Sequence, residues 1–180
     1  MEKLPVPHSI RKAFEGRIFT VVVESITTPK GGKLDVEIVR HPGSVVLIPV
    51  TNSGEIVLVR QYRHAIGRWV WELPAGTLRR SEDPRAGAAR ECQEEIGLIP
   101  ARLDPLGAFF PTPGYCDENM HFYKASGLRE PGPHDEKVEQ DEDEDIEKRA
   151  FTVDQVLSMI GSNEIVDLKT VAGVTLLTRT

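Results

Sequence analysis

The stretch from residue 76 to residue 98, GTLRRSEDPRAGAARECQEEIGL, constrains the fold and the chemistry of this chain more than any other segment. A predicted helix in this stretch carries three carboxylates within a span of five residues: Glu91, Glu94 and Glu95. Like charges this close repel one another and raise each other's pKa unless a cation lies between them. An ordinary solvated helix is the alternative, but it does not explain three near-adjacent glutamates without matching lysines at i+4. Hard carboxylate oxygens grouped in this way suit Mg²⁺ or Mn²⁺ bridged to substrate phosphates.

The boundaries of this helix are marked by residues that favour helix ends. Asp83 suits the N-cap, Pro84 suits the first helical position, and Gly97 suits the C-terminal cap. Residues at i, i+4 and i+8 form an apolar stripe along the predicted helix: Ala88, Cys92 and Ile96.

The acidic side chains of the helix are arranged by the same spacing. Glu91 and Glu95 are four residues apart, so their carboxylates point to one side, with Glu94 beside them. Arg90 lies next to this cluster, and we expect it to pair with Glu82, which the preceding loop would bring back over the helix. Such a pair would fix the loop without neutralising all of the acids.

Composition excludes several classes of protein. The 180 residues carry a net charge of −6, which argues against binding to a nucleic-acid backbone as the main role. An acidic protein can still bind a phosphorylated small molecule, because metal ions carry the positive charge. The two cysteines, Cys92 and Cys116, form no CxxC pair, so we expect the protein to be located in the reducing cytoplasm. We find no export signal and no run of about 18 apolar residues, so we expect no membrane span.

Predicted strands surround the first helix. Residues 17–26, 33–41 and 41–50 are rich in apolar and β-branched side chains and predict three strands, with a hairpin turn at TTPKGGK. Residues 55–63 predict a fourth strand, and 69–76 predict a short strand that runs directly into the glutamate-rich stretch. Strands precede and follow the helix without regular alternation, which indicates an α+β fold with a mixed sheet.

Two further helices are predicted near the C-terminus. Thr152 and Gln155 form a capping box for a helix over 153–160. Asp167 can cap a last helix over 168–178, whose apolar face would close the core.

The glutamate-rich stretch resembles the signature of a known family. Seven residues match the signature of the Nudix hydrolases in identity and spacing: Gly76, Glu82, Arg90, Glu91, Glu94, Glu95 and Gly97. The resemblance implies a hydrolase that splits a nucleoside diphosphate linked to another group, X. It also implies a loop–helix–loop metal site set in an α/β/α sandwich, the Nudix fold.

Roles for the residues of the stretch follow from the resemblance. Glu91 and Glu95 would bind the metal, and Glu94 would bind it directly or through water. The backbone carbonyl of Ala75 would be a further ligand, and Glu94 and Arg90 are also assigned to catalysis. The implied cofactor is Mg²⁺ or Mn²⁺, with two to three ions.

Segments outside the stretch narrow the resemblance. QYR at 61–63, WELPAG at 71–76 and PTPGYCDE at 111–118 resemble the ADP-ribose pyrophosphatase group. In that group the strands before the signature form a small antiparallel sheet that packs across a homodimer. The resemblance thus implies an N-terminal β-sheet subdomain over 1–45, for dimerisation, and a hydrolase domain over 46–180.

Candidate substrate-binding residues flank the stretch. Arg63 ends a predicted strand, and its planar guanidinium matches phosphate oxygens, although a surface arginine is the alternative. Trp69 and Trp71 can offer a stacking surface to a base, and core packing is the alternative for one of them. Glu72 would hydrogen-bond either the base or the protein. The resemblance assigns two more positions to substrate binding, Thr77 and Glu118. Glu118 lies on the 111–118 loop, for which a rigid turn between strands is the alternative interpretation.

A second acidic run occupies residues 138–148, between predicted strands at 120–126 and 146–152. A run of acids is usually a solvated loop. In the resembled group, however, a loop at this place closes on the metals, which makes Glu142 the general base and Glu144 a further metal ligand. Neighbouring aspartates offer similar chemistry: Asp141, Asp143 and Asp145.

The resemblance implies that ADP-ribose is hydrolysed to AMP and ribose 5-phosphate. Some enzymes of the group supply a basic residue from the N-terminal sheet, and here Val36 occupies the place where it is expected, with Arg40 close by. GDP-mannose, other nucleotide sugars, FAD and NADH therefore remain alternative substrates. A catalytically idle nucleotide sensor that reports to a partner is a further hypothesis, but such proteins usually lose signature carboxylates that this chain keeps.

Overall fold

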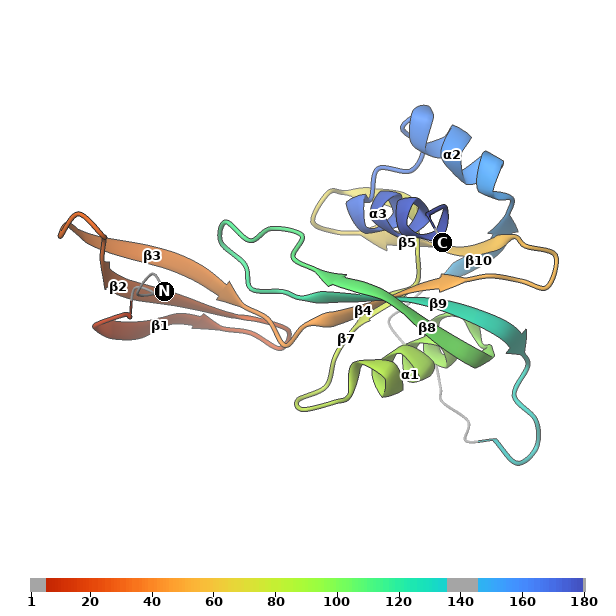
Figure 1. Cartoon of the computed structure of the whole chain (residues 1–180), viewed down its shortest axis with the longest axis horizontal. Helices are drawn as coiled ribbons and strands as arrows, with labels where there is room; N and C mark the ends of the chain where they lie inside the picture. The colour runs from red at the N-terminus through yellow and green to blue at the C-terminus, as the bar shows by residue number, and fades with distance from the viewer. Residues whose placement is uncertain (1–5, 136–145, 180) are drawn as a thin grey trace. The chain divides into compact units, whose positions relative to one another are not determined.

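The computed structural model describes residues 6–135 and 146–179 (Figure 1). The chain forms two compact units, one made of Met1–Gly43 with Phe110–Asn119 and one made of Ser44–Phe109 with Met120–Thr180. Within the described ranges, no helix has both the length and the apolar character needed to cross a bilayer.

The first unit is a three-stranded antiparallel sheet in the order β1-β2-β3. Its strands are β1 (Ser9–Glu15), β2 (Thr20–Thr27) and β3 (Lys33–Arg40). The predicted hairpin turn is confirmed, because Thr27 pairs with Lys33 across it. The strand β1 was not predicted: all seven of its residues are exposed, so no buried face marks it in the sequence. Phe110–Asn119, which lies in the predicted hydrolase domain, joins this unit because its backbone bonds to β3.

The second unit contains two sheets, in the orders β10-β5-β6 and β7-β4-β9-β8. The strand β4 pairs in parallel with β9 and antiparallel with β7, so the predicted mixed sheet is confirmed. The strands are β4 (Ser44–Pro49), β5 (Ile56–Arg63), β6 (Arg68–Glu72), β7 (Ala75–Thr77), β8 (Ile99–Phe109), β9 (Met120–Arg129) and β10 (Glu147–Phe151).

Prolines explain two differences from the predicted strands. The predicted strand over 69–76 is two strands in different sheets, β6 and β7, separated at Pro74, which has no N–H to continue a ladder. The long strand β8 was missed because Pro100 and Pro105 interrupt its pattern, and its register shifts between Pro105 and Gly107.

The described residues form three helices, α1 (Pro84–Ile96), α2 (Val153–Gly161) and α3 (Leu168–Leu177). The predicted N-caps of the two C-terminal helices, α2 and α3, are confirmed. The Thr152 hydroxyl accepts the Gln155 N–H at 3.2 Å while the Gln155 side chain accepts the Thr152 N–H at 2.8 Å. The Asp167 carboxylate accepts the Thr170 N–H at 2.9 Å.

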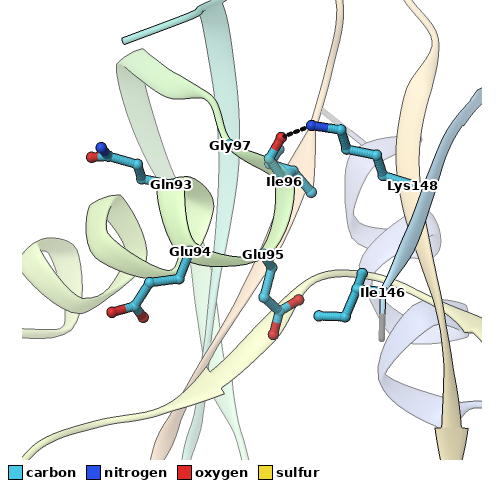
Figure 2. A pocket seen from close by; sticks show the side chains of 7 residues that line it. All are labelled: Gln93, Glu94, Glu95, Ile96, Gly97, Ile146 and Lys148. Atoms are coloured by element: carbon cyan, nitrogen blue, oxygen red, sulfur yellow. Dashed lines mark hydrogen bonds between the residues drawn. The ribbon is translucent and has the colours of Figure 1, made fainter. Parts of the chain in front are cut away.

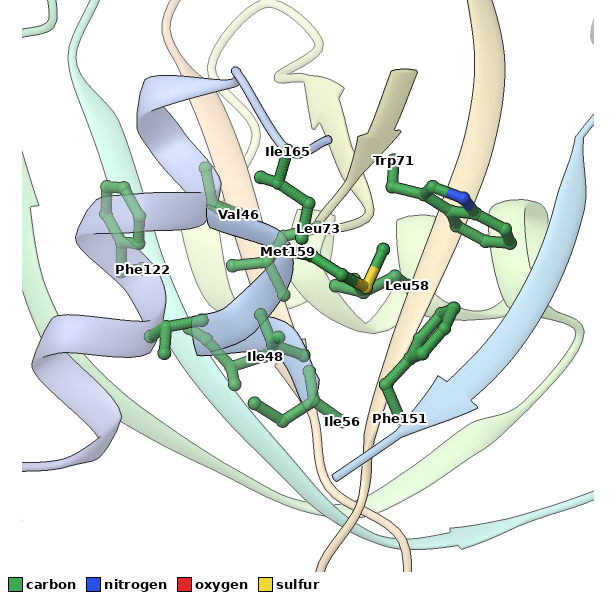
Figure 3. Close-up of a cluster of buried hydrophobic side chains, with 12 residues drawn as sticks. Val46, Ile48, Ile56, Leu58, Trp71, Leu73, Phe122, Phe151, Met159 and Ile165 are labelled. Atoms are coloured by element: carbon green, nitrogen blue, oxygen red, sulfur yellow. The ribbon is translucent and has the colours of Figure 1, made fainter. Parts of the chain in front are cut away.

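Helices cover both faces of the sheet that contains β4. Val45 and Leu47 point into a cluster with the apolar stripe of α1, whereas Val46 and Ile48 point into a cluster with α2 and α3 (Figure 3). All six residues of β4 are buried, and its continuous apolar run reflects a strand covered on both faces. The α/β/α sandwich implied by the sequence is therefore confirmed (Figure 1).

The two tryptophans of β6 have different environments. Trp71 is 9% exposed and contacts Phe151 edge to face, with ring centroids 5.1 Å apart (Figure 3). Trp69 is 43% exposed, with the guanidinium of Arg60 5.5 Å from its ring centroid. Of the two rings, only that of Trp69 presents a large accessible surface.

The burial of Trp71 predicts its contribution to stability. Trp71→Ala should lower the free energy of unfolding by about 3–5 kcal/mol, because the buried ring beside Phe151 would be replaced by a cavity. Trp69→Ala is the matched control on the same strand and should cost less than about 1 kcal/mol. Urea denaturation measures both values, and equal losses would contradict the assignment of Trp71 to the core.

Candidate metal and active site

The helix α1 is fixed at both ends. The Asp83 carboxylate accepts two backbone N–H groups of the first turn, at 3.0 and 3.1 Å. Gly97 adopts φ 70° and ψ 20°, the left-handed conformation that favours glycine at a helix end. Lys148 of β10 donates from Nζ to the carbonyl of Ile96 at 2.7 Å (Figure 2), which places a positive charge at the negative end of the helix dipole. The predicted caps Asp83 and Gly97 are thus confirmed.

Arg90 is the centre of the acidic cluster. Its guanidinium donates to both carboxylate oxygens of Glu82 at 2.9 Å, which confirms the predicted pair. Nη1 also donates to Glu91 at 2.7 Å and to Glu94 at 2.5 Å. Hydrogen bonding to Glu82 is the largest influence that raises the pKa of Arg90, so the guanidinium remains charged. Arg90 thus holds Glu82, Glu91 and Glu94 together.

The loop before the helix is fastened through Glu82. Its Oε2 accepts the Arg79 N–H at 2.8 Å, in addition to the bonds from Arg90. Hydrogen bonding from Arg90 is the main cause that lowers the pKa of Glu82 below its ordinary value. Thr77 takes part through its backbone, because its carbonyl accepts from Arg90 Nη2 at 3.3 Å. The loop thereby closes over the helix as the sequence predicted.

Gly76 allows the closest approach in the site. A Cβ atom placed on Gly76 would lie 1.9 Å from the carboxyl carbon of Glu91. No side chain fits there, so the glycine lets the Glu91 carboxylate rest directly against the backbone of β7. In the sequence this residue could be recognised only as part of the signature, since its contact partner lies on the helix.

Two more glutamates complete the cluster. Glu95 is 5% exposed, and its Oε2 accepts the N–H of Ala75 at 3.2 Å. Glu94 accepts from Arg79 at 3.4 Å as well as from Arg90. A cavity of about 210 Å³ lies beside these side chains, between the C-terminal end of α1 and the start of β10 (Figure 2). It is lined by Gln93, Glu94, Glu95, Ile96, Gly97, Ile146 and Lys148.

The donor set fits a hard divalent cation. Burial raises the pKa of Glu91 to about 7, although the charge and hydrogen bond of Arg90 act in the opposite direction. A cation near Glu91 and Glu95 would relieve this cost, and carboxylate and carbonyl oxygens are the ligands that Mg²⁺ prefers. In the part of the chain that the structure describes, no three His, Cys, Asp or Glu side chains converge as a ready-made metal group. Instead, Arg90 bonds to both Glu91 and Glu94.

A second charged network surrounds Glu72. Arg63 donates to its two oxygens at 2.7 and 2.8 Å, and the side chain of Glu72 is only 2% exposed. Lys169, in the first turn of α3, also donates to Glu72 and lies 3.1 Å from Asp167. Glu72 is therefore bound by the protein's own cations, whereas the Arg63 side chain stays 41% exposed. Arg63 is the last residue of β5, and Glu72 is the last residue of the antiparallel strand β6.

Lys169 was not singled out in the sequence. One signal was present: a lysine in the first turn of a helix opposes the helix dipole and needs a carboxylate partner. That partner, Glu72, is 97 residues away, so the sequence alone did not identify it.

The remaining predicted residues belong to other segments of the chain. Glu118 belongs to the first unit, where its side chain is 20% exposed and its Oε1 lies 3.9 Å from Nδ1 of His41. Glu142 and Glu144 lie outside the described residues. Of the other assigned residues, Trp71 lies in the core cluster next to β10, and Arg63 with Glu72 forms the ion pair described above.

The raised pKa of Glu91 predicts a pH-dependent stability in metal-free buffer. Between pH 4.5 and about 7 the unfolded chain releases this proton while the folded protein retains it, so the stability contributed at Glu91 falls as pH rises. Relative to Glu91→Gln, the wild type should lose roughly 3 kcal/mol across this window. Denaturation of both proteins in EDTA measures the difference, and a difference independent of pH would contradict the raised pKa of Glu91.

Comparison with known proteins agrees with this geometry. A model of the NUDIX domain matches residues 40–171. The chain is 38% identical to an ADP-ribose pyrophosphatase of Bacillus subtilis over 87% of this chain and 83% of that protein. It is 39% identical to a methanol dehydrogenase activator of Bacillus methanolicus, over 89% and 85% of the two chains. The crystal structure of an ADP compounds hydrolase shares the fold, with a TM-score of 0.84 and 19% identity over 98% and 94% of the two chains. The chain therefore belongs to the Nudix hydrolase family.

Proposed function

We propose that this Nudix hydrolase cleaves the pyrophosphate bond of ADP-ribose to give AMP and ribose 5-phosphate. The observation that carries the proposal is the carboxylate cluster of Glu91, Glu94 and Glu95 on α1, packed against Gly76 and supported by one arginine. Such a cluster has the donor chemistry for metal-bound phosphates. The relative named ADP-ribose pyrophosphatase, which matches most of the chain, supports the choice of substrate.

Nudix hydrolases generally need a divalent metal. In this chain we propose Mg²⁺ or Mn²⁺, two to three ions, bound by the carboxylates of Glu91, Glu94 and Glu95 and by the carbonyl of Ala75. Glu144, outside the described residues, is proposed as a further ligand. When bound, the ions would neutralise the diphosphate and lower the pKa of a water molecule.

The residues of the chain then have separate tasks. Glu142 is proposed as the general base that removes a proton from the attacking water. Glu94 supports the reacting groups, and Arg90 holds Glu82, Glu91 and Glu94 in place. Because positioning and charge stabilisation dominate phosphoryl transfer, a rigid cluster of this kind is suited to the reaction.

Substrate binding is proposed to use the exposed side of the Arg63 guanidinium, with Glu72 holding its other side. Because Trp71 is buried, Trp69 is the more accessible ring for stacking, although Trp71 supports the same strand. Two further contacts are proposed from the family resemblance: Thr77 and Glu118.

We further propose a cytoplasmic homodimer. The first unit exposes large apolar side chains that a second copy could cover, in keeping with a dimerisation sheet. They include Ile10, Phe14, Ile18, Phe19 and Leu34. Both cysteines are free thiols, as expected in a reducing compartment, and the net charge of −6 disfavours nucleic acid as a partner.

A substrate panel separates the proposal from its alternatives. ADP-ribose, GDP-mannose, UDP-glucose, FAD and NADH would be compared by kcat/KM with Mg²⁺ and with Mn²⁺. The proposal requires ADP-ribose to have the highest value. Equal values for all five would count against the subfamily assignment, and nucleotide binding without hydrolysis would indicate a sensor.

The metal assignment predicts the loss of hydrolysis in two variants. Release of AMP and ribose 5-phosphate should depend on Mg²⁺ and fall by about 10³-fold or more in Glu91→Gln and in Glu95→Gln, since each removes a charged ligand. Glu55→Gln is a control, because Glu55 lies in the turn before β5, where its N–H donates to the Thr51 hydroxyl and its carboxylate accepts from Ser53. Activity retained in both variants would overturn the metal site.

The assignment of Glu142 is tested separately. Glu142→Gln should lower kcat by about 10²-fold or more while Mn²⁺ binding persists, because a base is lost and the ligands on α1 remain. Asp141→Asn serves as the neighbouring control. A near-wild-type rate in Glu142→Gln would move the base to Glu94 or to another acid of the 138–148 run.

A further inference from the structure

The segment Phe110–Asn119 is attached to β3 by main-chain hydrogen bonds within the first unit. Val39 donates its N–H to the carbonyl of Tyr115 at 2.7 Å. The N–H of Asp117 in turn donates to the carbonyl of Val39 at 3.1 Å. The segment therefore runs parallel to the end of β3 for a short distance, with Val39 opposite Cys116.

Arg40, the next residue of β3, ties this segment to the sheet a second time. Nη1 donates to Asp117 at 2.8 Å, and Nη2 donates to Glu24 of β2. The other oxygen of Asp117 accepts the N–H of His41 at 2.8 Å. Glu24 is only 8% exposed, so its charge depends on the guanidinium for compensation. One arginine thus joins two strands of the sheet to the segment.

The pair between Arg40 and Asp117 is a charged one. Burial alone would raise the pKa of Asp117, but the hydrogen bonds from Arg40 and from the His41 amide outweigh burial and hold it below the ordinary value. Glu118 follows directly in the chain. Its N–H lies 3.4 Å from the Sγ of Cys116 and its carboxylate lies 3.9 Å from His41 Nδ1. Fixing Asp117 therefore also limits where the Glu118 carboxylate can lie.

We propose that Arg40 is a positioning residue for substrate recognition, which sets the place of Glu118 by holding Asp117 against the N-terminal sheet. The inference rests on the proposed role of Glu118 in contact with the substrate. It gives the N-terminal sheet a second task beside dimerisation, because the sheet would fix a recognition residue of its own chain. In this role the guanidinium of Arg40 bonds to Asp117 and Glu24 and needs no direct bond to the substrate.

A double-mutant cycle tests the proposal on ADP-ribose hydrolysis. Arg40→Met and Glu118→Gln should each raise KM by about tenfold with kcat within about twofold, because both weaken recognition and leave the carboxylate cluster intact. The double variant should also show about a tenfold rise, since one residue acts through the other. Lys12→Met is the matched control, because Lys12 pairs with Glu15 at 2.6 Å on the same sheet without touching the segment.

Hydrogen exchange gives a readout that does not depend on activity. Amides of residues 114–118 should exchange faster in Arg40→Met and in Asp117→Asn, and at the wild-type rate in Lys12→Met. Asp117→Asn weakens the same link, because it removes the negative charge and one of the two acceptor oxygens. It leaves Arg40 to compensate Glu24, so it still tests the link if Arg40→Met fails to fold.

Two results would overturn the proposal. KM effects that multiply to about 100-fold in the double variant would mean that Arg40 acts on the substrate independently of Glu118. Unchanged exchange in both Arg40→Met and Asp117→Asn would mean that the ion pair does not hold the segment. A wild-type protein inactive on ADP-ribose would instead refute the proposed function, and the exchange measurement would still decide whether Arg40 positions the segment.

Discussion

The site depends on one guanidinium, that of Arg90, which bonds to Glu82, Glu91 and Glu94 at the same time. Without it the three carboxylates would repel one another, and the loop that carries Glu82 would lose the two hydrogen bonds between Glu82 and Arg90 of α1. Its position is secured in turn by the caps of the helix at Asp83 and Gly97. The helix, the loop and the acidic cluster are therefore held together by the bonds of Arg90.

The same interaction leaves charge uncompensated. With Glu95, the cluster holds four carboxylates, and their negative charge exceeds the single positive charge of Arg90 when all are ionised. Arg79 offsets little, because its side chain is 69% exposed to solvent. Burial makes this excess costly, as the raised pKa of Glu91 shows. Divalent cations would remove that cost, which is why the cluster is better suited to metal-bound phosphates than to a purely structural role.

How much of this could be predicted from the sequence depended on the range of each interaction. The helix, its caps and the pair between Arg90 and Glu82 were predicted correctly, because they rest on spacings of eight residues or fewer. The α/β/α sandwich was implied by the family resemblance, and in the structure alternate residues of the buried strand β4 meet helices on both faces.

Longer-range features escaped prediction. Lys169 binds Glu72 across 97 residues, and Arg40 binds Asp117 across 77, and no local pattern announces either contact. The sequence also did not show which of the two tryptophans on one strand would be buried. Trp71 packs against Phe151, which is 80 residues away in the sequence. The edge strand β1 carries no buried face, so its periodicity held no signal to detect.

The central claim is that the carboxylates of α1 bind the metal ions that hold the diphosphate. Its most direct test is the anomalous scattering of Mn²⁺ in crystals grown with an α,β-methylene analogue of ADP-ribose, which binds but cannot be cleaved. The account predicts anomalous peaks within about 2.0–2.5 Å of carboxylate oxygens of Glu91 and Glu95, shared with the diphosphate of the analogue. An analogue bound with Mn²⁺ at other residues, and with Glu91 and Glu95 still free of metal, would contradict it.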